Sequence, residues 1–151
     1  MDKLYYINLD KRTDRLEHLE KNVLPFLQIP GLKQQRISAV DHTHYEHISQ
    51  RGAGCSLSHL KIWKDAIKND YKKIIVMEDD FELLQPNNRI NDFIKKLETM
   101  DFSICNFAYN NMRPLSKTEF EGFYRCNNLQ TTDRKSTRLN SSHQIISYAV
   151  F

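Results

Sequence analysis

Runs of apolar residues predict four β-strands in the chain. Residues 4–9 and 36–40 are rich in aromatic or β-branched side chains, and residues 101–107 alternate between apolar and polar positions, as strands do. Residues 73–77 instead form a continuous apolar run of strand length. Such a run is typical of a central parallel strand that is covered on both faces.

Three amphipathic segments between these strands are predicted to be helices. The first follows a cap at Thr13 or Asp14, and Pro25 is expected to end or kink it. The second is expected at about residues 56–69, and the third follows a cap at Asn88. The residues expected to face the core are, for the three helices in turn, Leu16, Leu19, Val23 and Leu27; Leu57, Leu60, Trp63 and Ile67; and Ile90, Phe93, Ile94 and Leu97.

The order of these elements predicts the fold class. Repeated strand–helix–strand units place a mostly parallel sheet between helices, with right-handed crossovers. The polar, histidine-rich residues 41–51 are expected to form a long loop. We therefore predict an α/β, Rossmann-like domain whose sheet is flanked by helices.

Composition and charge fit one ordinary globular domain, with 151 residues of which 40% are hydrophobic and 27% are charged. The formal net charge of +3 comes entirely from Arg134, Lys135 and Arg138, and the neutral remainder argues against a nucleic-acid partner. No stretch reaches the roughly 18 consecutive apolar residues of a membrane-spanning helix. The polar start at Met1 is unlike a signal peptide, so the expected location is the cytoplasm.

The cysteines suggest packing rather than a disulfide framework. They form no CxxC pair and are odd in number: Cys55, Cys105 and Cys126. Cys55 and His59 are four residues apart and could share a zinc ion, but no second cysteine pair completes a four-ligand set. Three further histidines lie close by in sequence: His42, His44 and His47. Ser58 and His59 are not a hydrolase dyad, because neighbours on a helix point about 100° apart.

Polar side chains follow three of the predicted strands, where ligands bind in open α/β sheets. They are Asn8, Asp10, Arg12 and Arg15 after the first strand, Asp41 after the second, and Glu78, Asp79 and Asp80 after the buried strand. Three adjacent carboxylates repel one another unless a cation compensates. Their hard oxygen ligands favour Mg²⁺ or Mn²⁺ over zinc. Such a metal could bridge the phosphates of a nucleoside diphosphate.

Simpler explanations of the same residues stay open. The three carboxylates could begin a loop and cap the element that follows. Arg12 and Arg15 could be solvated charges on a first helical turn. At the same sheet edge as the carboxylates, these two arginines could instead contact phosphate.

Four blocks of residues, in this order and spacing, resemble glycosyltransferase family 25. The blocks are Tyr6-Ile7-Asn8-Leu9-Asp10-x-Arg12-x-x-Arg15, Ala39-Val40-Asp41, Gly54-Cys55-Ser56-Leu57-Ser58-His59 and Ile75-Val76-Met77-Glu78-Asp79-Asp80. That family includes lipooligosaccharide galactosyltransferases and the collagen galactosyltransferase domains. The resemblance covers about residues 4–110.

The resemblance implies a GT-A fold, a UDP-sugar donor, and Mn²⁺ or Mg²⁺ bound through a variant of the Asp-x-Asp motif. Asp80 would be the principal metal ligand, with Glu78 and Asp79 helping to hold the metal and the donor. The nucleotide pocket would be lined by Asn8, Asp10, Arg12 and Asp41. Ser58 and His59 match the family's Ser-His pair, which is expected near the donor. An acceptor made at a membrane would bring the enzyme to that surface.

The resemblance also implies more protein than the chain contains. Members of the family continue into an acceptor-binding half, and inverting transfer needs a base to deprotonate the acceptor. We assign no residue to that role, although Glu119 and Glu121 are later carboxylates. Residues 1–132 are therefore expected to be a partial donor-binding domain. Residues 133–151 are expected to be an atypical basic tail, which is either non-native, because it resembles a translated sequencing adapter, or a genuine terminus.

Three hypotheses follow for function. The first is a metal-dependent glycosyltransferase that moves galactose or glucose from a UDP-sugar to a saccharide or hydroxylated acceptor, as in lipopolysaccharide biosynthesis. The second is a catalytically incomplete module that binds a nucleotide sugar. The third is an α/β interaction domain without a ligand.

Overall fold

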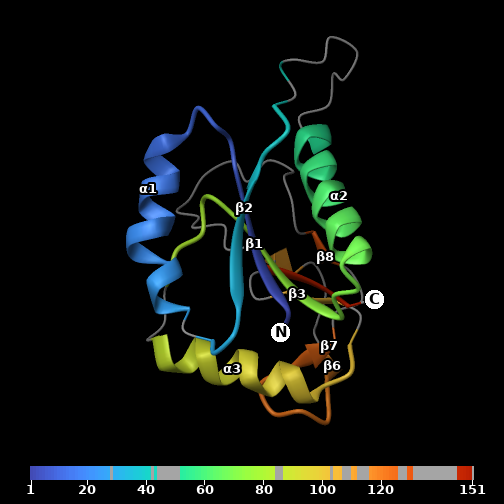
Figure 1. Cartoon of the computed structure of the whole chain (residues 1–151). Helices are drawn as coiled ribbons and strands as arrows, with labels where there is room; N and C mark the ends of the chain where they lie inside the picture. The colour runs from blue at the N-terminus through green and yellow to red at the C-terminus, as the bar shows by residue number, and fades with distance from the viewer. Residues whose placement is uncertain are drawn as a thin grey trace.

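A five-stranded sheet forms the centre of the computed structural model (Figure 1). Its strands, in spatial order, are β2 (Lys33–Ser38), β1 (Lys3–Asn8), β3 (Lys73–Glu78), β9 (Ile146–Val150) and β4 (Ile104–Asn106). The structure describes residues 1–27, 29–41, 43, 52–83, 87–102, 104–106, 110–111, 116–125, 129–130 and 146–150.

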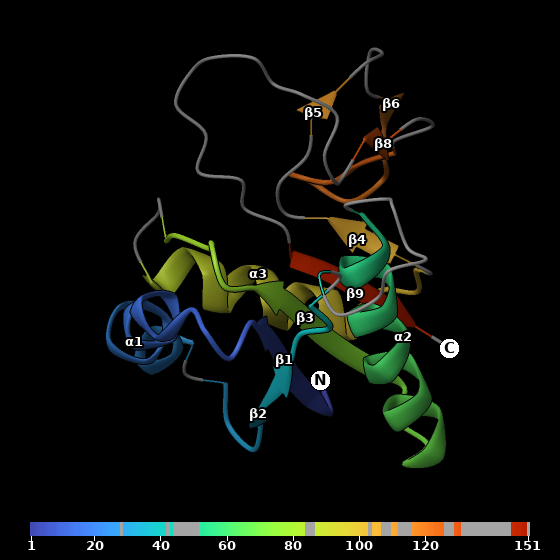
Figure 2. The same ribbon diagram turned by 90° about the horizontal axis from the view of Figure 1, so that it is seen from above.

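Within the described residues, three helices flank this sheet, and Figure 2 shows α1 and α2 on opposite sides of it. The helices are α1 (Thr13–Asn22), α2 (Gly52–Lys68) and α3 (Asn87–Thr99), and a 3₁₀ turn, η1 (Leu24–Phe26), follows α1. α1 ends before Pro25, as the sequence predicted, because proline cannot donate the next helical hydrogen bond. Among the described residues, no helix is both long and apolar enough to cross a bilayer.

Strand directions confirm the α/β class. β1 pairs in parallel with both β2 and β3. β9 runs antiparallel to β3 and to β4, so β4 points the same way as β3. The sheet is thus mostly parallel with one antiparallel strand, as in many α/β folds.

Alternation along the strands divides the core into two clusters. Leu4 of β1 and Ile75 of β3 face α1 and α3, where they pack with Leu19 and Leu97. The intervening residues of both strands face α2 and pack with its Ile62 and Ala66; they are Tyr5, Ile7, Ile74 and Val76. Residues 74–77 are all buried, which confirms that β3 is a central strand covered on both faces.

The prediction of which face of α2 packs against the core is wrong, because the predicted face is largely exposed. Leu60, Trp63 and Ile67 are 39%, 40% and 62% exposed, whereas Ile62 and Ala66 are fully buried. Both stripes have helical spacing, so periodicity alone does not separate them. Packing against β1 and β3 selects the stripe that contains Ile62 and Ala66.

Several element boundaries differ from those predicted. β2 starts and ends earlier than residues 36–40, and α2 begins at Gly52 rather than near residue 56. The N-cap of α1 is Arg12, without a side-chain capping bond, so Thr13 and Asp14 are already inside the helix. α3 likewise begins one residue before the predicted cap. Helix ends depend on local contacts, and propensity defines them poorly.

Short strand pairs lie outside the main sheet, and the sequence did not predict them. β5 (Asn110–Asn111) pairs with β8 (Leu129–Gln130), and β6 (Ser116–Lys117) pairs with β7 (Tyr124–Arg125). Two-residue strands carry no periodicity that could reveal them.

The segment expected to be a tail supplies β9. Residues 131–145 lie outside the described part of the chain, and the backbone of β9 lies between β3 and β4. The domain boundary at residue 132 stays a prediction.

Candidate functional site

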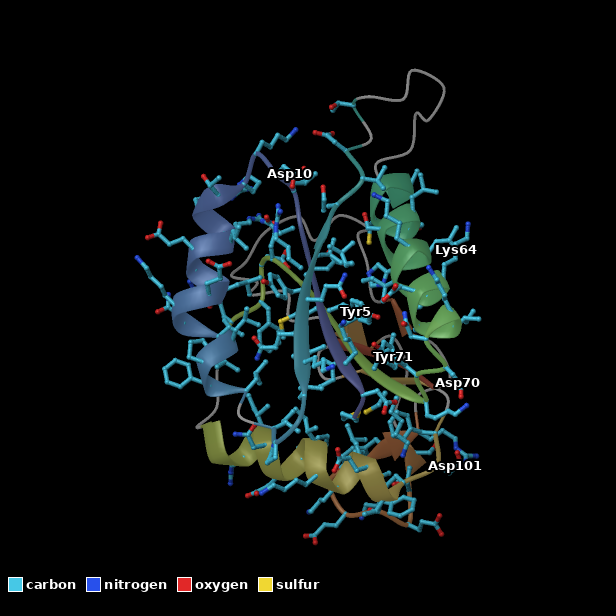
Figure 3. The ribbon with its side chains drawn as sticks, viewed as in Figure 1. Tyr5, Asp10, Lys64, Asp70, Tyr71 and Asp101 are labelled. Carbon is cyan, nitrogen blue, oxygen red and sulfur yellow. The ribbon has the colours of Figure 1, made fainter. Side chains whose placement is uncertain are left out.

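The carboxyl ends of the three parallel strands meet at one edge of the sheet. The register pairs Asn8 with Ser38 and Ile7 with Glu78, so these strand ends lie side by side. Asp10 follows β1 at this edge, while Tyr5 and Tyr71 lie nearer the other end (Figure 3). The carboxyl edge is where ligands bind in open α/β sheets.

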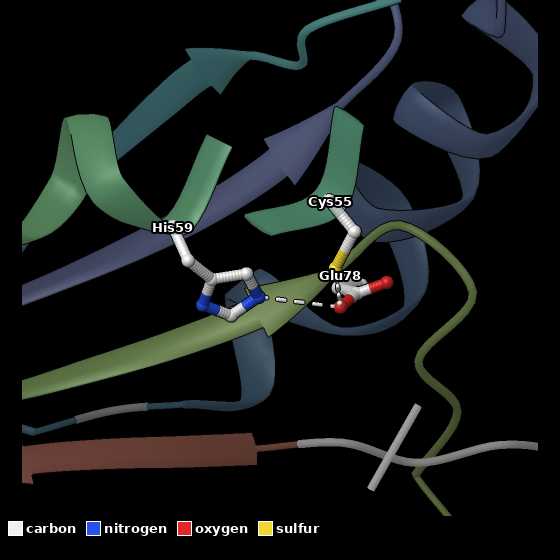
Figure 4. A group of neighbouring side chains, drawn as sticks. All are labelled: Cys55, His59 and Glu78. Carbon is white, nitrogen blue, oxygen red and sulfur yellow. Dashed lines mark hydrogen bonds and ion pairs between the residues drawn. The ribbon is translucent and has the colours of Figure 1, made fainter. Parts of the chain in front are cut away.

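Alternation at the end of β3 separates the three adjacent carboxylates. Asp79 points toward α1 and is 8% exposed. Glu78 points toward α2, where it contacts Cys55 and His59 (Figure 4). Asp80 lies in the following turn, and the residue as a whole is exposed. Partial desolvation of its carboxyl group, together with the neighbouring charge of Glu78, raises the pKa of Asp80.

Asp79 is held by two hydrogen bonds from groups that the sequence placed at the site. Arg15 Nη1 donates to Asp79 Oδ1 at 2.8 Å, and Asn8 Nδ2 donates to Asp79 Oδ2 at 2.8 Å. Both carboxylate oxygens are thus paired with protein donors. This anchors the turn after β3 to β1 and α1.

Asn8 links Asp79 to a residue that sequence reasoning missed, Arg36. Its Nδ2 also donates to the carbonyl of Arg12, and its Oδ1 accepts bonds from Arg36 Nη2 at 2.8 Å and Nε at 3.2 Å. With 1% of its surface exposed, Asn8 is buried and fully hydrogen-bonded. A charged residue inside a predicted strand was the signal that could have revealed Arg36.

Asp10 completes this network at the surface. It accepts hydrogen bonds from Ser38 Oγ at 2.8 Å and from Arg36 Nη2 at 2.6 Å, and these two bonds lower its pKa. Asn8, Asp10, Arg15 and Asp79 therefore form one connected group.

Arg12 and Asp41 make separate contacts. Arg12 forms a two-pronged ion pair with Asp14 in the first turn of α1, and its hydrogen bonds lower the pKa of Asp14 to about 2. Asp41 accepts from Lys11 Nζ at 2.6 Å, which joins the loop after β1 to the loop after β2. The bonds from Lys11 and Thr43 hold the pKa of Asp41 far below its usual range.

Ser58 and His59 point to different surroundings. Ser58 is fully buried; its hydroxyl donates to the carbonyl of Gly54 and accepts from the amide of Val40. It thereby fastens the loop after β2 to α2. His59 Nε2 lies 3.3 Å from Glu78 Oε1.

Glu78 and Cys55 influence each other's protonation. Burial raises the pKa of the Cys55 thiol to about 12, and the charge of Glu78 adds to this. Burial alone would raise the pKa of Glu78 too, but hydrogen bonds from His59 and Cys55 outweigh it and keep this pKa below its ordinary value. Glu78 therefore carries its negative charge at neutral pH.

Four residues noted in the sequence lie outside the described part of the chain: His42, His44, His47 and Cys126. Within the described residues, the group that can hold a metal through mixed ligands is Cys55, His59 and Glu78.

Comparisons with known proteins agree with one another. The model of glycosyltransferase family 25 (LPS biosynthesis protein) matches residues 1–147. A glycosyltransferase 25 family member of Drosophila melanogaster is 21% identical over an alignment of 141 residues, and the match covers 80% of this chain and 23% of the relative.

Two further relatives are shorter matches. A family member of Anopheles gambiae is 26% identical over an alignment of 98 residues, and the match covers 53% of this chain and 17% of the relative. A protein of Acanthamoeba polyphaga mimivirus named as a glycosyltransferase is 33% identical over an alignment of 102 residues, and the match covers 59% of this chain and 31% of the relative. The chain thus spans less than a third of the length of each of these relatives.

Proposed function

Because the chain belongs to glycosyltransferase family 25, we propose that it is the donor-binding part of a glycosyltransferase. The reaction proposed is transfer of a hexose, galactose or glucose, from a UDP-sugar to a saccharide or hydroxylated acceptor, with inversion. The observation that carries the proposal is the paired arrangement of Glu78 and Asp80 at the carboxyl end of β3.

Glu78 and Asp80 fit a divalent metal of the Mn²⁺ or Mg²⁺ type. One residue separates them, and their mutual repulsion contributes to the raised pKa of Asp80. A cation would relieve this repulsion. Both described hydrogen bonds of Glu78 end on Oε1, which leaves Oε2 for a hard cation. When bound, such a metal neutralises the charge of the donor diphosphate.

Asp79 has a positioning role in this proposal. Its two oxygens bind Arg15 and Asn8, so its contribution is to hold the turn that presents Asp80. The family resemblance gave Asp79 a share in binding metal and donor, and the hydrogen bonds favour the indirect role.

The polar residues at the same edge would receive the nucleotide. Arg12 is partly exposed, and its guanidinium can exchange its exposed partner Asp14 for phosphate. Asp10 and Asp41 keep their negative charge, and their oxygens can accept hydrogen bonds from ribose hydroxyls.

The metal role of Asp80 can be tested by measuring UDP binding calorimetrically with and without Mn²⁺. We expect binding to need Mn²⁺ and Asp80→Asn to abolish it, since the variant loses the anionic ligand. Asp101→Asn, an exposed residue before β4, is the matched control and should bind like the wild type. Unchanged binding by Asp80→Asn would remove the metal role.

The second candidate is a nucleotide-sugar-binding module without turnover. The observation that bears on it is the position of the two later carboxylates that could have served as the base. Glu119 and Glu121 are exposed between β6 and β7, which lie near α3 in Figure 1, away from the carboxyl edge. Neither residue is therefore assigned as the base.

Donor turnover separates these two candidates. An enzyme releases UDP from a UDP-hexose by transfer or slow hydrolysis, whereas a binding module retains the donor intact. If UDP and UDP-sugars produce no shift in melting temperature with Mn²⁺ present, both candidates fail and the interaction domain is favoured.

A further inference from the structure

Three side chains of metal-ligand type meet where α2 passes the carboxyl end of β3 (Figure 4). Cys55 and His59 are four residues apart on α2 and project from the same face of the helix. Glu78 ends β3 and faces α2 through the alternation of that strand. The sulfur, nitrogen and oxygen ligand atoms all lie within 4.8 Å of one another.

The spacing of these atoms is close to that of a tetrahedral site. Cys55 Sγ and His59 Nε2 each lie 3.3 Å from Glu78 Oε1. With bonds of about 2.3 Å to sulfur and about 2.0 Å to nitrogen and oxygen, tetrahedral zinc separates such ligand atoms by about 3.3–3.5 Å. Both separations from Glu78 Oε1 are close to this range, and the sulfur and nitrogen ligand atoms lie within 4.8 Å of each other.

We propose that Cys55, His59 and Glu78 bind a borderline-soft divalent cation, with Zn²⁺ preferred over Mn²⁺ and Mg²⁺. Thiolate and imidazole ligands select zinc, whereas the harder ions prefer oxygen. Three protein ligands leave a fourth position for water, as in zinc sites that exchange ligands. On binding, the Cys55 thiol releases its proton to solvent, because a coordinated thiol is deprotonated.

The rigidity of the two supporting elements favours a preformed site. Two ligands come from the helix α2 and one from the central strand β3, so none depends on a loop. The Trp63 ring lies 6.2 Å from the His59 ring, centroid to centroid, and limits how far the imidazole can turn. This contact also gives the half-exposed Trp63 a local role.

The zinc site and the proposed donor-metal site share Glu78 but differ in their other ligands. Cys55 and His59 belong only to the zinc site, and Asp80 belongs only to the donor-metal site. The zinc proposal does not rest on the proposed function. Substitutions at Cys55 and Asp80 can therefore test the two sites separately.

Cobalt titration of the reduced, metal-free chain tests the proposal directly. Co²⁺ replaces Zn²⁺ in such sites, and a thiolate bonded to it absorbs by charge transfer in the near ultraviolet. We expect this band to saturate at one equivalent of Co²⁺ and to disappear when Zn²⁺ is added. A chain that shows no charge-transfer band would overturn the proposal.

Matched cysteine variants assign the band to one sulfur. Cys55→Ser should abolish it, while Cys105→Ser, at the other described free cysteine, and Cys126→Ser should retain it. His59→Gln keeps the thiol and should weaken Co²⁺ binding by more than about tenfold. Loss of a residue that only hydrogen-bonds to a metal ligand already costs about tenfold, and His59 is itself a proposed ligand. A band that survives in folded Cys55→Ser would contradict the assignment.

The variant Asp80→Asn distinguishes the proposed zinc site from the proposed donor-metal site. We expect this variant to keep the cobalt band although it loses Mn²⁺-dependent UDP binding. If the band is present but no variant binds UDP, the zinc site stands and the donor proposal fails. If Asp80→Asn loses the band as well, the cobalt bound by the thiolate also depends on Asp80, and the assignment to Cys55, His59 and Glu78 is wrong.

Discussion

Asn8 is the residue on which the carboxyl edge of the sheet depends most. It joins three segments, because its amide binds Arg36 of β2, the turn before α1 and Asp79 after β3. An amide can do this because it offers both donors and acceptors. A carboxylate at the same place would repel Asp79, and an apolar residue would leave Asp79 Oδ2 without the hydrogen bond that Asn8 donates.

Replacement of this amide should therefore destabilise the fold. We expect Asn8→Ala to lower the free energy of unfolding by about 2–3 kcal/mol, since buried partners of Asn8 lose their hydrogen bonds. Urea denaturation monitored by circular dichroism measures the change. Asn22→Ala, an exposed asparagine at the end of α1, should stay within about 0.5 kcal/mol of the wild type. Equal losses in both variants would argue against the network.

At the scale of elements, α2 shows how packing chooses between two apolar stripes. The stripe of Ile62 and Ala66 faces β1 and β3, and the stripe of Leu60, Trp63 and Ile67 is largely exposed. The same rotation of the helix brings Cys55 and His59 to Glu78. The rotation of α2 about its axis therefore determines both which residues are buried and which side chains reach Glu78.

Alanine substitutions on the two stripes test this orientation. Ile62→Ala should cost about 2–5 kcal/mol of unfolding free energy, because it leaves a cavity against the sheet. Leu60→Ala should cost less than about 1 kcal/mol, since much of that side chain is already in water. Thermal or urea denaturation compares the two. A larger loss for Leu60→Ala would indicate the opposite face.

The contact between Tyr5 of β1 and Asp65 of α2 predicts alkaline sensitivity. The Tyr5 hydroxyl donates to Asp65 Oδ2 at 2.5 Å, and burial together with this bond raises the pKa of Tyr5 far above its ordinary value of 10.0. The folded state thus favours the protonated phenol. Its contribution to stability is complete below pH 10 and is lost as the pH rises further.

Melting temperatures measured across this pH range test the linkage. The wild type should lose stability above pH 10 more steeply than Tyr5→Phe, which has no proton to release. At neutral pH the variant should be less stable, because Asp65 loses a donor. Parallel pH profiles for the two proteins would show that Tyr5 does not contribute.

At the scale of the whole molecule, β9 occupies a place in the sheet that the sequence did not predict. The backbone of β9 pairs with β3 and β4 and so lies inside the sheet. The sequence assigned the same residues to an atypical tail. Without β9, the backbone groups of β3 along one side would have no strand partner.

Truncation after Thr132 distinguishes these descriptions. If β9 belongs to the sheet, the shortened chain should lose on the order of a few kcal/mol, given about 1 kcal/mol for each net hydrogen bond. A full-length variant with Ser147→Pro provides a milder test, because proline removes a donor within β9. Stability equal to that of the full chain in both variants would support a dispensable tail. Denaturant titration gives the answer.

The sequence by itself determined the α/β order, the buried central strand and the polar residues at its carboxyl edge. These follow from local periodicity and from the rule that parallel strand ends gather at one edge. The face of α2 was not determined, because both stripes have helical spacing. Only the tertiary structure paired Asp79 with Asn8 and Arg15, and Glu78 with Cys55 and His59. These partners come from segments distant in sequence, and strand register and helix rotation decide their contacts.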